Sequence, residues 1–213
     1  MKFFLSIATV LFISLSSYAQ QFATTDDGKK VKLNDDKTWD YVNDSTQAVT
    51  DTAVKATFTK PASSTAIIKS QKTDFGFWYN PGMWSIQKEY KLSPSAENML
   101  EAKNADGYSI IVAEPIQVPM ENLEGIIKQS KLSGKADDVV FEKSEFRMVN
   151  NVKVLYLKFS GSSSGIKFTY VGYFTSDESG TYQLMCYTSK NLFDKKEKDF
   201  MALLNGLVLI KAK

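Results

Sequence analysis

Apolar and polar residues alternate along much of the chain after residue 70, and this period of two predicts β-strands. In the segment TDFGFWYNPGMWSI, Phe75, Phe77 and Tyr79 occupy alternate positions, and Asn80-Pro81-Gly82 follows as a turn. Trp78 breaks the alternation, so we expect it on the opposite face of the strand. A tryptophan exposed on that face would mark a contact with a ligand or a protein.

The next alternating segment, SAENMLEAKNADGYSIIVAEP, predicts a hairpin whose turn is residues 104–107. Tyr108, Ile110 and Val112 share one face of its second strand, and apolar residues also occupy the other face. A strand that is apolar on both faces is typical of the centre of a covered sheet. Glu114 ends this strand, where strand-end side chains often line a pocket.

A helical pattern starts near Pro119, with Leu123 and Ile127 one turn apart, and Gly134 stops it. Four long alternating segments follow, and short polar turns between them predict an antiparallel meander. These turns are residues 150–151, 162–165 and 177–180. A second amphipathic helix is expected from about Leu192 to Leu204, before the apolar run LVLI.

The N-terminus has the pattern of a secretory signal peptide. Lys2 precedes the apolar run LSIATVLFISL, and the small residues Ser17 and Ala19 suit a signal peptidase that cleaves after Ala19. The alternative, a membrane anchor, requires roughly 20 apolar residues, which this run does not reach. We therefore expect a signal peptide over residues 1–19, export to the periplasm or the extracellular space, and no transmembrane segment after cleavage.

Residues 20–42 predict a small three-stranded meander with strands at 22–25, 29–33 and 38–42. Its segment from Asp27 to Trp39 resembles a motif of secreted bacterial proteins, D-G-[KR]-x-V-x-L-x-x-D-G-T-W, although Lys37 replaces the usual Gly. The acidic turns do not have the spacing of a calcium loop, so no metal is expected.

Residues 43–70 are rich in Thr, Ser and Ala and predict a linker. They would separate the small meander from a larger domain at 71–213.

The composition narrows the possible chemistry. The chain has no histidine, which excludes Ser-His-Asp and Cys-His catalysis and His-ligated zinc. The 26 basic and 24 acidic residues nearly balance, and Arg147 is the only arginine, so we expect no nucleic-acid binding. The only cysteine, Cys186, lies in an alternating segment and is expected to be a small buried residue without a disulfide partner. No cofactor is expected.

Residues 72–210 resemble the PsbP-like domain. The resemblance rests on F-x-F-x-Y-x-P-x-x-W at residues 75–84, on GYSIIVAEP, on YVGYFTSDESGTYQLMCYT and on F-x-x-L-L-N-G-L at residues 200–207. It implies an α+β fold in which helices flank an antiparallel sheet, an α/β/α sandwich. Members of the family bind partners and share no catalytic residues, so the resemblance implies no particular function.

Three functions remain open at this point. We expect an exported, non-enzymatic binding or accessory module of the bacterial envelope, whose partner is an envelope protein or a small ligand. A small carboxylate-dependent hydrolase or carbohydrate-active domain is the first alternative, and a purely structural envelope component is the second. The candidate hydrolase carboxylates are Glu101, Glu114, Glu142 and Glu145, and the candidate contact residues are Trp78, Trp84, Glu114 and Tyr108.

Overall fold

A computed structural model describes two compact units, residues 1–49 and 50–213. Within them, the described residues are 21–24, 30–33, 39–41, 53–87, 96–132, 137–163 and 165–210. The predicted signal peptide lies outside these residues. Each unit is described by itself below.

The N-terminal unit contains a three-stranded antiparallel sheet in the order β1-β2-β3. The strands are β1 (Gln21–Thr24), β2 (Lys30–Leu33) and β3 (Trp39–Tyr41). Their register places Val31 opposite Tyr41 and Leu33 opposite Trp39. The predicted meander is therefore present, and its resemblance to the secreted-protein motif stays a prediction.

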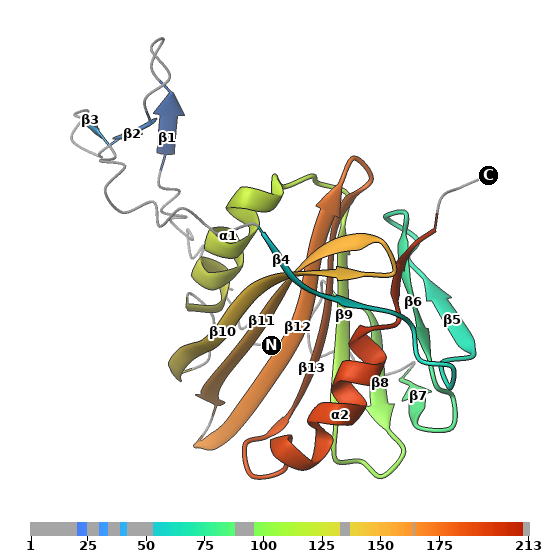
Figure 1. Ribbon diagram of the computed structural model, residues 1–213. Helices are drawn as coiled ribbons and strands as arrows, with labels where there is room; N and C mark the ends of the chain where they lie inside the picture. Colours follow the sequence, from blue (N-terminus) through green and yellow to red (C-terminus); the bar gives the residue numbers. More distant parts are fainter. Residues whose placement is uncertain are drawn as a thin grey trace, which may run out of the picture. The chain divides into compact units, whose positions relative to one another are not determined.

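The larger unit is built on an eight-stranded sheet in the order β4-β10-β11-β12-β13-β9-β8-β7 (Figure 1). All neighbouring strands are antiparallel except β4 and β10, which are parallel. The strands are β4 (Val54–Phe58), β7 (Trp84–Ile86), β8 (Ala96–Ala102), β9 (Tyr108–Glu114), β10 (Asp137–Val149), β11 (Val152–Ser163), β12 (Ile166–Asp177) and β13 (Gly180–Ser189).

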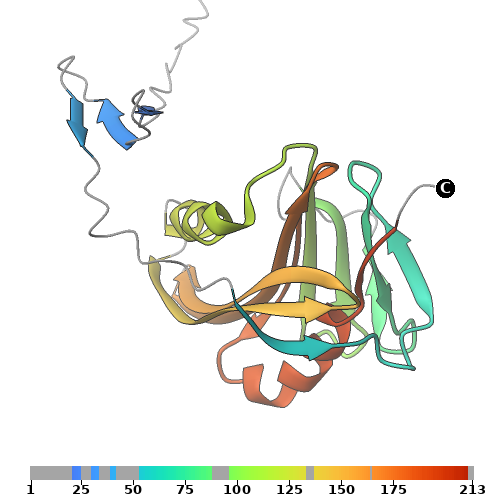
Figure 2. The same ribbon diagram turned by 45° about the horizontal axis from the view of Figure 1, so that its top comes forward.

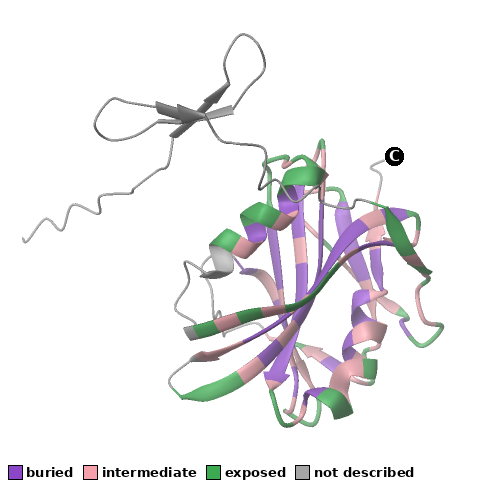
Figure 3. Cartoon of the chain, turned by 60° about the vertical axis from the view of Figure 1, so that its left-hand side comes forward, coloured by how far each residue is buried: buried purple, intermediate pink, exposed green. Residues whose placement is uncertain are grey.

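One helix packs on each face of this sheet (Figure 2). Helix α1 (Met120–Leu132) buries Leu123 and Ile127 in one core, and α2 (Phe193–Leu204) buries Phe200 in the other. Alternate residues of β11 enter the two cores, Leu155 on the side of α1 and Tyr156 on the side of α2. Figure 3 shows buried residues concentrated in the middle of the sheet and exposed residues on the outer side of α1.

The face of the large sheet that α2 covers is also covered by a second, smaller sheet. A three-stranded sheet in the order β14-β6-β5 also packs there, with Phe75, Phe77 and Leu207 in the same core as α2. Its strands are β5 (Ala66–Lys69), β6 (Phe75–Tyr79) and β14 (Leu207–Leu209). The described part is thus mostly β-sheet with two helices, and it is less clearly a helix-flanked sandwich than we expected.

The predicted linker over residues 43–70 is wrong for residues 53–70. Strand β4 joins the edge of the large sheet beside β10, and β5 pairs with β6. The physical reason is tertiary pairing, which overrides a local composition of Thr, Ser and Ala that does not favour a core strand.

Asn150 joins three parts of this fold. It begins the tight turn between β10 and β11, where Asn150 and Asn151 have φ of 47° and 66°. The side chain of Asn150 donates to the carbonyls of Asn205 and Leu207 and accepts from the N–H of Lys60. The end of β4, the turn and the segment after α2 are therefore held together by one amide.

Candidate functional site

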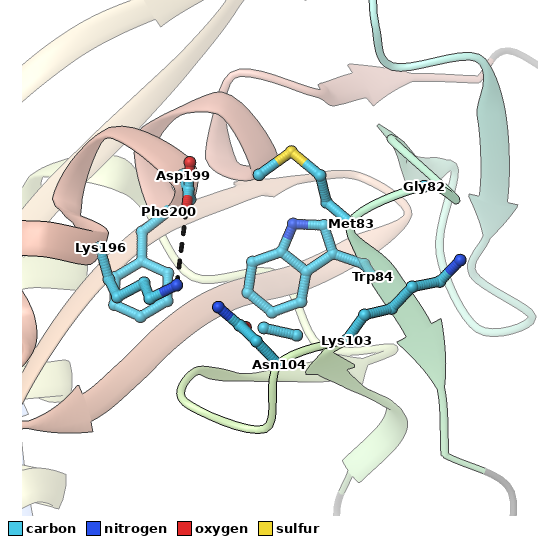
Figure 4. A pocket seen from close by; sticks show the side chains of 9 residues that line it. Gly82, Met83, Trp84, Lys103, Asn104, Lys196, Asp199 and Phe200 are labelled. Carbon is cyan, nitrogen blue, oxygen red and sulfur yellow. Dashed lines mark ion pairs between the residues drawn. The ribbon is translucent and has the colours of Figure 1, made fainter.

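A hollow of about 210 Å³ opens beside Trp84, and we call it the Trp84 hollow. Three segments line it: the turn into β7, the turn between β8 and β9, and the middle of α2 (Figure 4). Its lining residues are Gly82, Met83, Trp84, Ala102, Lys103, Asn104, Lys196, Asp199 and Phe200. Distant segments of the chain thus meet at one place, as is common at ligand sites.

The apolar floor of the hollow belongs to the core. Trp84 is 3% exposed and Phe200 0%, and their ring centroids lie 6.1 Å apart. The turn at Asn80-Pro81-Gly82 sets Trp84 in place, since the Asn80 carbonyl accepts from the Trp84 N–H at 3.0 Å. Gly107 lets the β8–β9 turn approach the helix, because a Cβ there would lie 2.8 Å from the Phe200 ring.

Lys196, one of the two lysines that line the hollow, is paired with two carboxylates. The Lys196 ammonium lies 2.6 Å from an Asp106 carboxylate oxygen and 3.9 Å from an Asp199 oxygen. Asn104 donates its side-chain amide to the same Asp106 oxygen at 2.9 Å. The Lys196 side chain is only 14% exposed, so it is held at the hollow and does not extend into solvent.

Polar atoms of the lining lie at different edges of the Trp84 ring. Figure 4 shows the indole nitrogen on the edge that faces Met83, whereas the ends of Lys196 and Asn104 lie on the side of the six-membered ring. Lys103 extends in the opposite direction. Together the lining residues offer N–H donors from an indole, an amide and an ammonium, and a carboxylate acceptor.

Of the predicted contact residues, only Trp84 lines the hollow. Trp78 lies on β6 and is half-buried, with the Lys60 ammonium 5.1 Å from its ring centroid. It turns away from the core that holds Phe77, as its break in the alternation predicted. Trp78 is therefore half-buried at a place apart from the hollow, and it does not form a site with the other predicted contact residues.

Tyr108 and Glu114 also lie away from the hollow. Glu114 is exposed at the end of β9. Tyr108 begins a row of aromatic rings that crosses five strands on the α1 side of the sheet, with neighbouring centroids 5.0 to 5.4 Å apart. Three of the four ring contacts are stacked and the fourth is tilted, so the rings cover much of one another's faces and the row is best explained as packing. Its members are Tyr108, Tyr187, Tyr170, Phe159 and Phe141.

Three of the four candidate hydrolase carboxylates already have partners. Glu101 accepts from the Gln87 amide at 2.9 Å, Glu142 accepts from Ser160, and Glu145 pairs with Arg147 at 2.6 Å. In the part of the chain that the structure describes, no group of three acidic or cysteine side chains is placed to hold a metal ion. None of its helices is long and apolar enough to cross a membrane.

Arg147 is the centre of a buried polar network beside α2. Its guanidinium lies 3.6 Å from the Tyr156 ring centroid and 3.3 Å from the Tyr173 hydroxyl. Burial raises the pKa of Tyr156 to about 12, although the nearby Arg147 charge acts in the opposite direction. Burial alone would raise the pKa of Glu145, but hydrogen bonds and charges from Arg147 and Lys143 outweigh it and leave this pKa below its usual value.

The sequence did not point to Lys196, Asp199, Asn104 or Lys103 as lining residues. Phe200 entered the predictions only through the pattern F-x-x-L-L-N-G-L at residues 200–207. The one available signal was the mixed-charge run at 194–199, whose partner in the β8–β9 turn lies about 90 residues away and leaves no local pattern.

Comparison with solved structures supports the fold. The solution structure of cyanobacterial PsbP (CyanoP) from Synechocystis sp. PCC 6803 aligns with a TM-score of 0.50 and 12% identity, over 70% of this chain and 94% of that one. The larger unit therefore has a PsbP-like fold. A protein from Bacteroides thetaiotaomicron VPI-5482 aligns with a TM-score of 0.43 and 13% identity, over 70% of this chain and 49% of that one. A protein of unknown function from Pseudomonas aeruginosa aligns with a TM-score of 0.44 and 11% identity, over 69% of this chain and 98% of that one.

Comparison of sequences gives a family without an assigned activity. No curated protein matches the chain. Residues 2–117 match the family described as protein of unknown function (DUF3157). Because this match covers more than half of the 213 residues, the chain belongs to the DUF3157 family.

Proposed function

We propose that this protein is an exported, non-enzymatic binding or accessory protein of the cell envelope, and that the Trp84 hollow is its contact site. One observation carries the proposal: the hollow combines an apolar floor with polar groups that come from three separate segments. Such a combination is typical of sites that hold a ligand or a side chain of a partner.

Binding is favoured over hydrolysis by the state of the carboxylates. Acid–base glycoside hydrolysis generally needs two carboxyl groups on either side of one bond. Asp199 is the only acidic residue among those that line the hollow, and it already lies 3.9 Å from the Lys196 ammonium. These contacts support a role in recognition.

The proposed location rests on the sequence of residues 1–19. Their single lysine, apolar run and terminal Ser17 and Ala19 have the pattern of a cleaved leader. The finer proposal for the fold is a variant of the α/β/α sandwich in which a small sheet takes part of one helical layer.

Filling the hollow tests the proposal. Asn104 is exposed on the rim, so Asn104→Tyr adds bulk there without removing a core side chain. Gln117→Tyr makes a similar change at an exposed residue away from the hollow and serves as the control. Tagged wild-type protein and both variants would be incubated with envelope extract, and the retained proteins and small molecules identified by mass spectrometry.

We expect at least one species that wild type and Gln117→Tyr retain and that Asn104→Tyr loses. Equal melting temperatures of the variants would show that the fold is intact. If all three proteins retain the same species, or none retains any, the hollow is not a contact site.

A further inference from the structure

We infer that the ligand of the Trp84 hollow is a neutral sugar residue, either a free monosaccharide or one unit of a glycan. The inference rests on the proposed function, because it identifies the ligand class of the same site. It is carried by the charge balance, the hydrogen-bonding groups and the size of the hollow.

The charge balance favours a neutral ligand. Lys196 is already compensated by Asp106 at 2.6 Å and by Asp199 at 3.9 Å. The ammonium of Lys103 extends away from these groups (Figure 4). An anion would compete with two carboxylates for one lysine, and a cation would lie beside that lysine. Among the described lining residues, an anion therefore gains only Lys103, whose ammonium points the other way, and a cation gains no carboxylate that is not already paired with Lys196.

The hydrogen-bonding groups suit hydroxyls. Asn104 and Lys196 offer N–H donors and Asp199 offers carboxylate acceptors, and the Trp84 indole nitrogen lies at the edge of the hollow beside Met83. A hydroxyl both donates and accepts, so adjacent hydroxyls of one sugar ring can satisfy donors and acceptors placed side by side. Met83 and the edge of Trp84 offer an apolar surface for the C–H groups of the ring.

The size of the hollow fits one ring. Its volume of about 210 Å³ exceeds the roughly 150 Å³ of a cavity that holds benzene. It is smaller than the roughly 300 to 1,000 Å³ of pockets for drug-sized ligands. One six-membered ring with its substituents therefore fits, and a longer glycan would extend outside.

Titration of the 15N-labelled protein tests the inference. The probes are D-glucose, D-galactose, D-mannose and N-acetyl-D-glucosamine, compared with D-glucuronate, D-glucosamine and cyclohexanol. Amide shifts of Gly82, Asn104 and Asp199 report on the hollow by NMR. We expect at least one neutral sugar to shift these amides with a millimolar dissociation constant, and the charged sugars and cyclohexanol to bind at least tenfold more weakly.

Matched variants place the binding. Asp199→Asn keeps the shape of the side chain and replaces its carboxylate, whereas Asp194→Asn makes the same change at an exposed position of the same helix. We expect the first to weaken sugar binding about tenfold and the second to leave it within twofold. Asn104→Tyr, which fills the hollow, should abolish it, and melting curves would show that each variant is folded.

Several results would overturn the inference. Preferred binding of a charged sugar or of cyclohexanol would contradict the charge or the hydroxyl argument. Binding that Asp199→Asn and Asn104→Tyr leave unchanged would lie elsewhere on the protein. If no sugar binds while Asn104→Tyr still loses a species from envelope extract, the sugar assignment fails and the proposed contact site stands.

Discussion

Replacing Asn150 by glycine tests how the larger unit is held together. The Asn150 side chain donates to the carbonyls of Asn205 and Leu207 at 2.8 and 2.7 Å and accepts from the N–H of Lys60 at 2.8 Å. Glycine removes all three bonds. It keeps the turn, because a residue with φ of 47° is better served by glycine than by any other substitution.

The expected cost follows from those three bonds. Each intramolecular hydrogen bond contributes a net ~1 kcal/mol, and a buried group left without a partner costs about 1–3 kcal/mol. Asn150 is half-buried, so water can reach some of the groups that lose a partner. Glycine also relieves the left-handed backbone at this position, which recovers part of the lost stability. We expect Asn150→Gly to lower the free energy of unfolding by about 2–4 kcal/mol.

Urea unfolding followed by circular dichroism measures this change, and Asn151→Gly is the matched control. Asn151 has φ of 66° in the same turn and is exposed. We expect its replacement to change stability by at most ~1 kcal/mol, and in the stabilising direction if at all. Equal stability of the two glycine variants would refute the view that the Asn150 amide joins β4, the turn and the segment after α2.

Three further predictions concern single residues. Gly206→Ala should unfold or strongly destabilise the protein, because its Cβ would lie 1.9 Å from the Trp78 carbonyl oxygen. Gly125→Ala places its Cβ where no atom lies within 4 Å, so it should stabilise α1 by roughly 0.5–1 kcal/mol in the same urea assay. Cys186 is buried and its pKa is raised to about 12, so Ellman's reagent at pH 8 should titrate no thiol in the native protein and one in urea; rapid labelling of native protein would contradict its burial. The pKa of Glu145 in the folded protein lies below the ordinary 4.5. Its contribution to stability is therefore present above pH 4.5 and is lost as the pH falls through the folded-state pKa. The difference in free energy of unfolding between wild type and Glu145→Gln should narrow from pH 7 to pH 3.5, and a constant difference would contradict the shift.

The elements of the larger unit that have local signals could be predicted from the sequence. Asn150-Asn151 predicted a tight turn, and both residues have the positive φ that such a turn requires. The hairpin of β8 and β9 and both helices also lie where the periodicity placed them. In each case the residues that determine the conformation are close neighbours in the chain.

Strands β4 and β5 could not be predicted in this way. Val54–Phe58 becomes a strand because β10, some 90 residues later, offers an edge to pair with. The alternation of exposed and half-buried residues in β4 is weak, since an edge strand buries little of its surface. Composition alone therefore could not distinguish this strand from a linker.

The residues of the hollow also divide into those with a local sequence signal and those placed by long-range contacts. Trp84 was a candidate from its place after a turn, whereas Lys196 and Asp199 gain their role only because α2 crosses the β8–β9 turn. The contact of Gly107 with Phe200 and the ion pair of Lys196 with Asp106 join these two elements, and each spans about 90 residues of sequence. Long-range contacts of this kind leave no periodic signal.

The construction of the hollow determines where its function can be tested. Trp84 and Phe200 are 3% and 0% exposed and belong to the main core, so truncating either should cost about 3–5 kcal/mol. Loss of binding in such a variant would report unfolding as readily as lost contact. Asn104 is exposed and the Asp199 side chain is 36% exposed, so changes there alter the surface that a ligand meets and leave the core intact. Recognition and folding can therefore be separated at the rim of the hollow, and not at its floor.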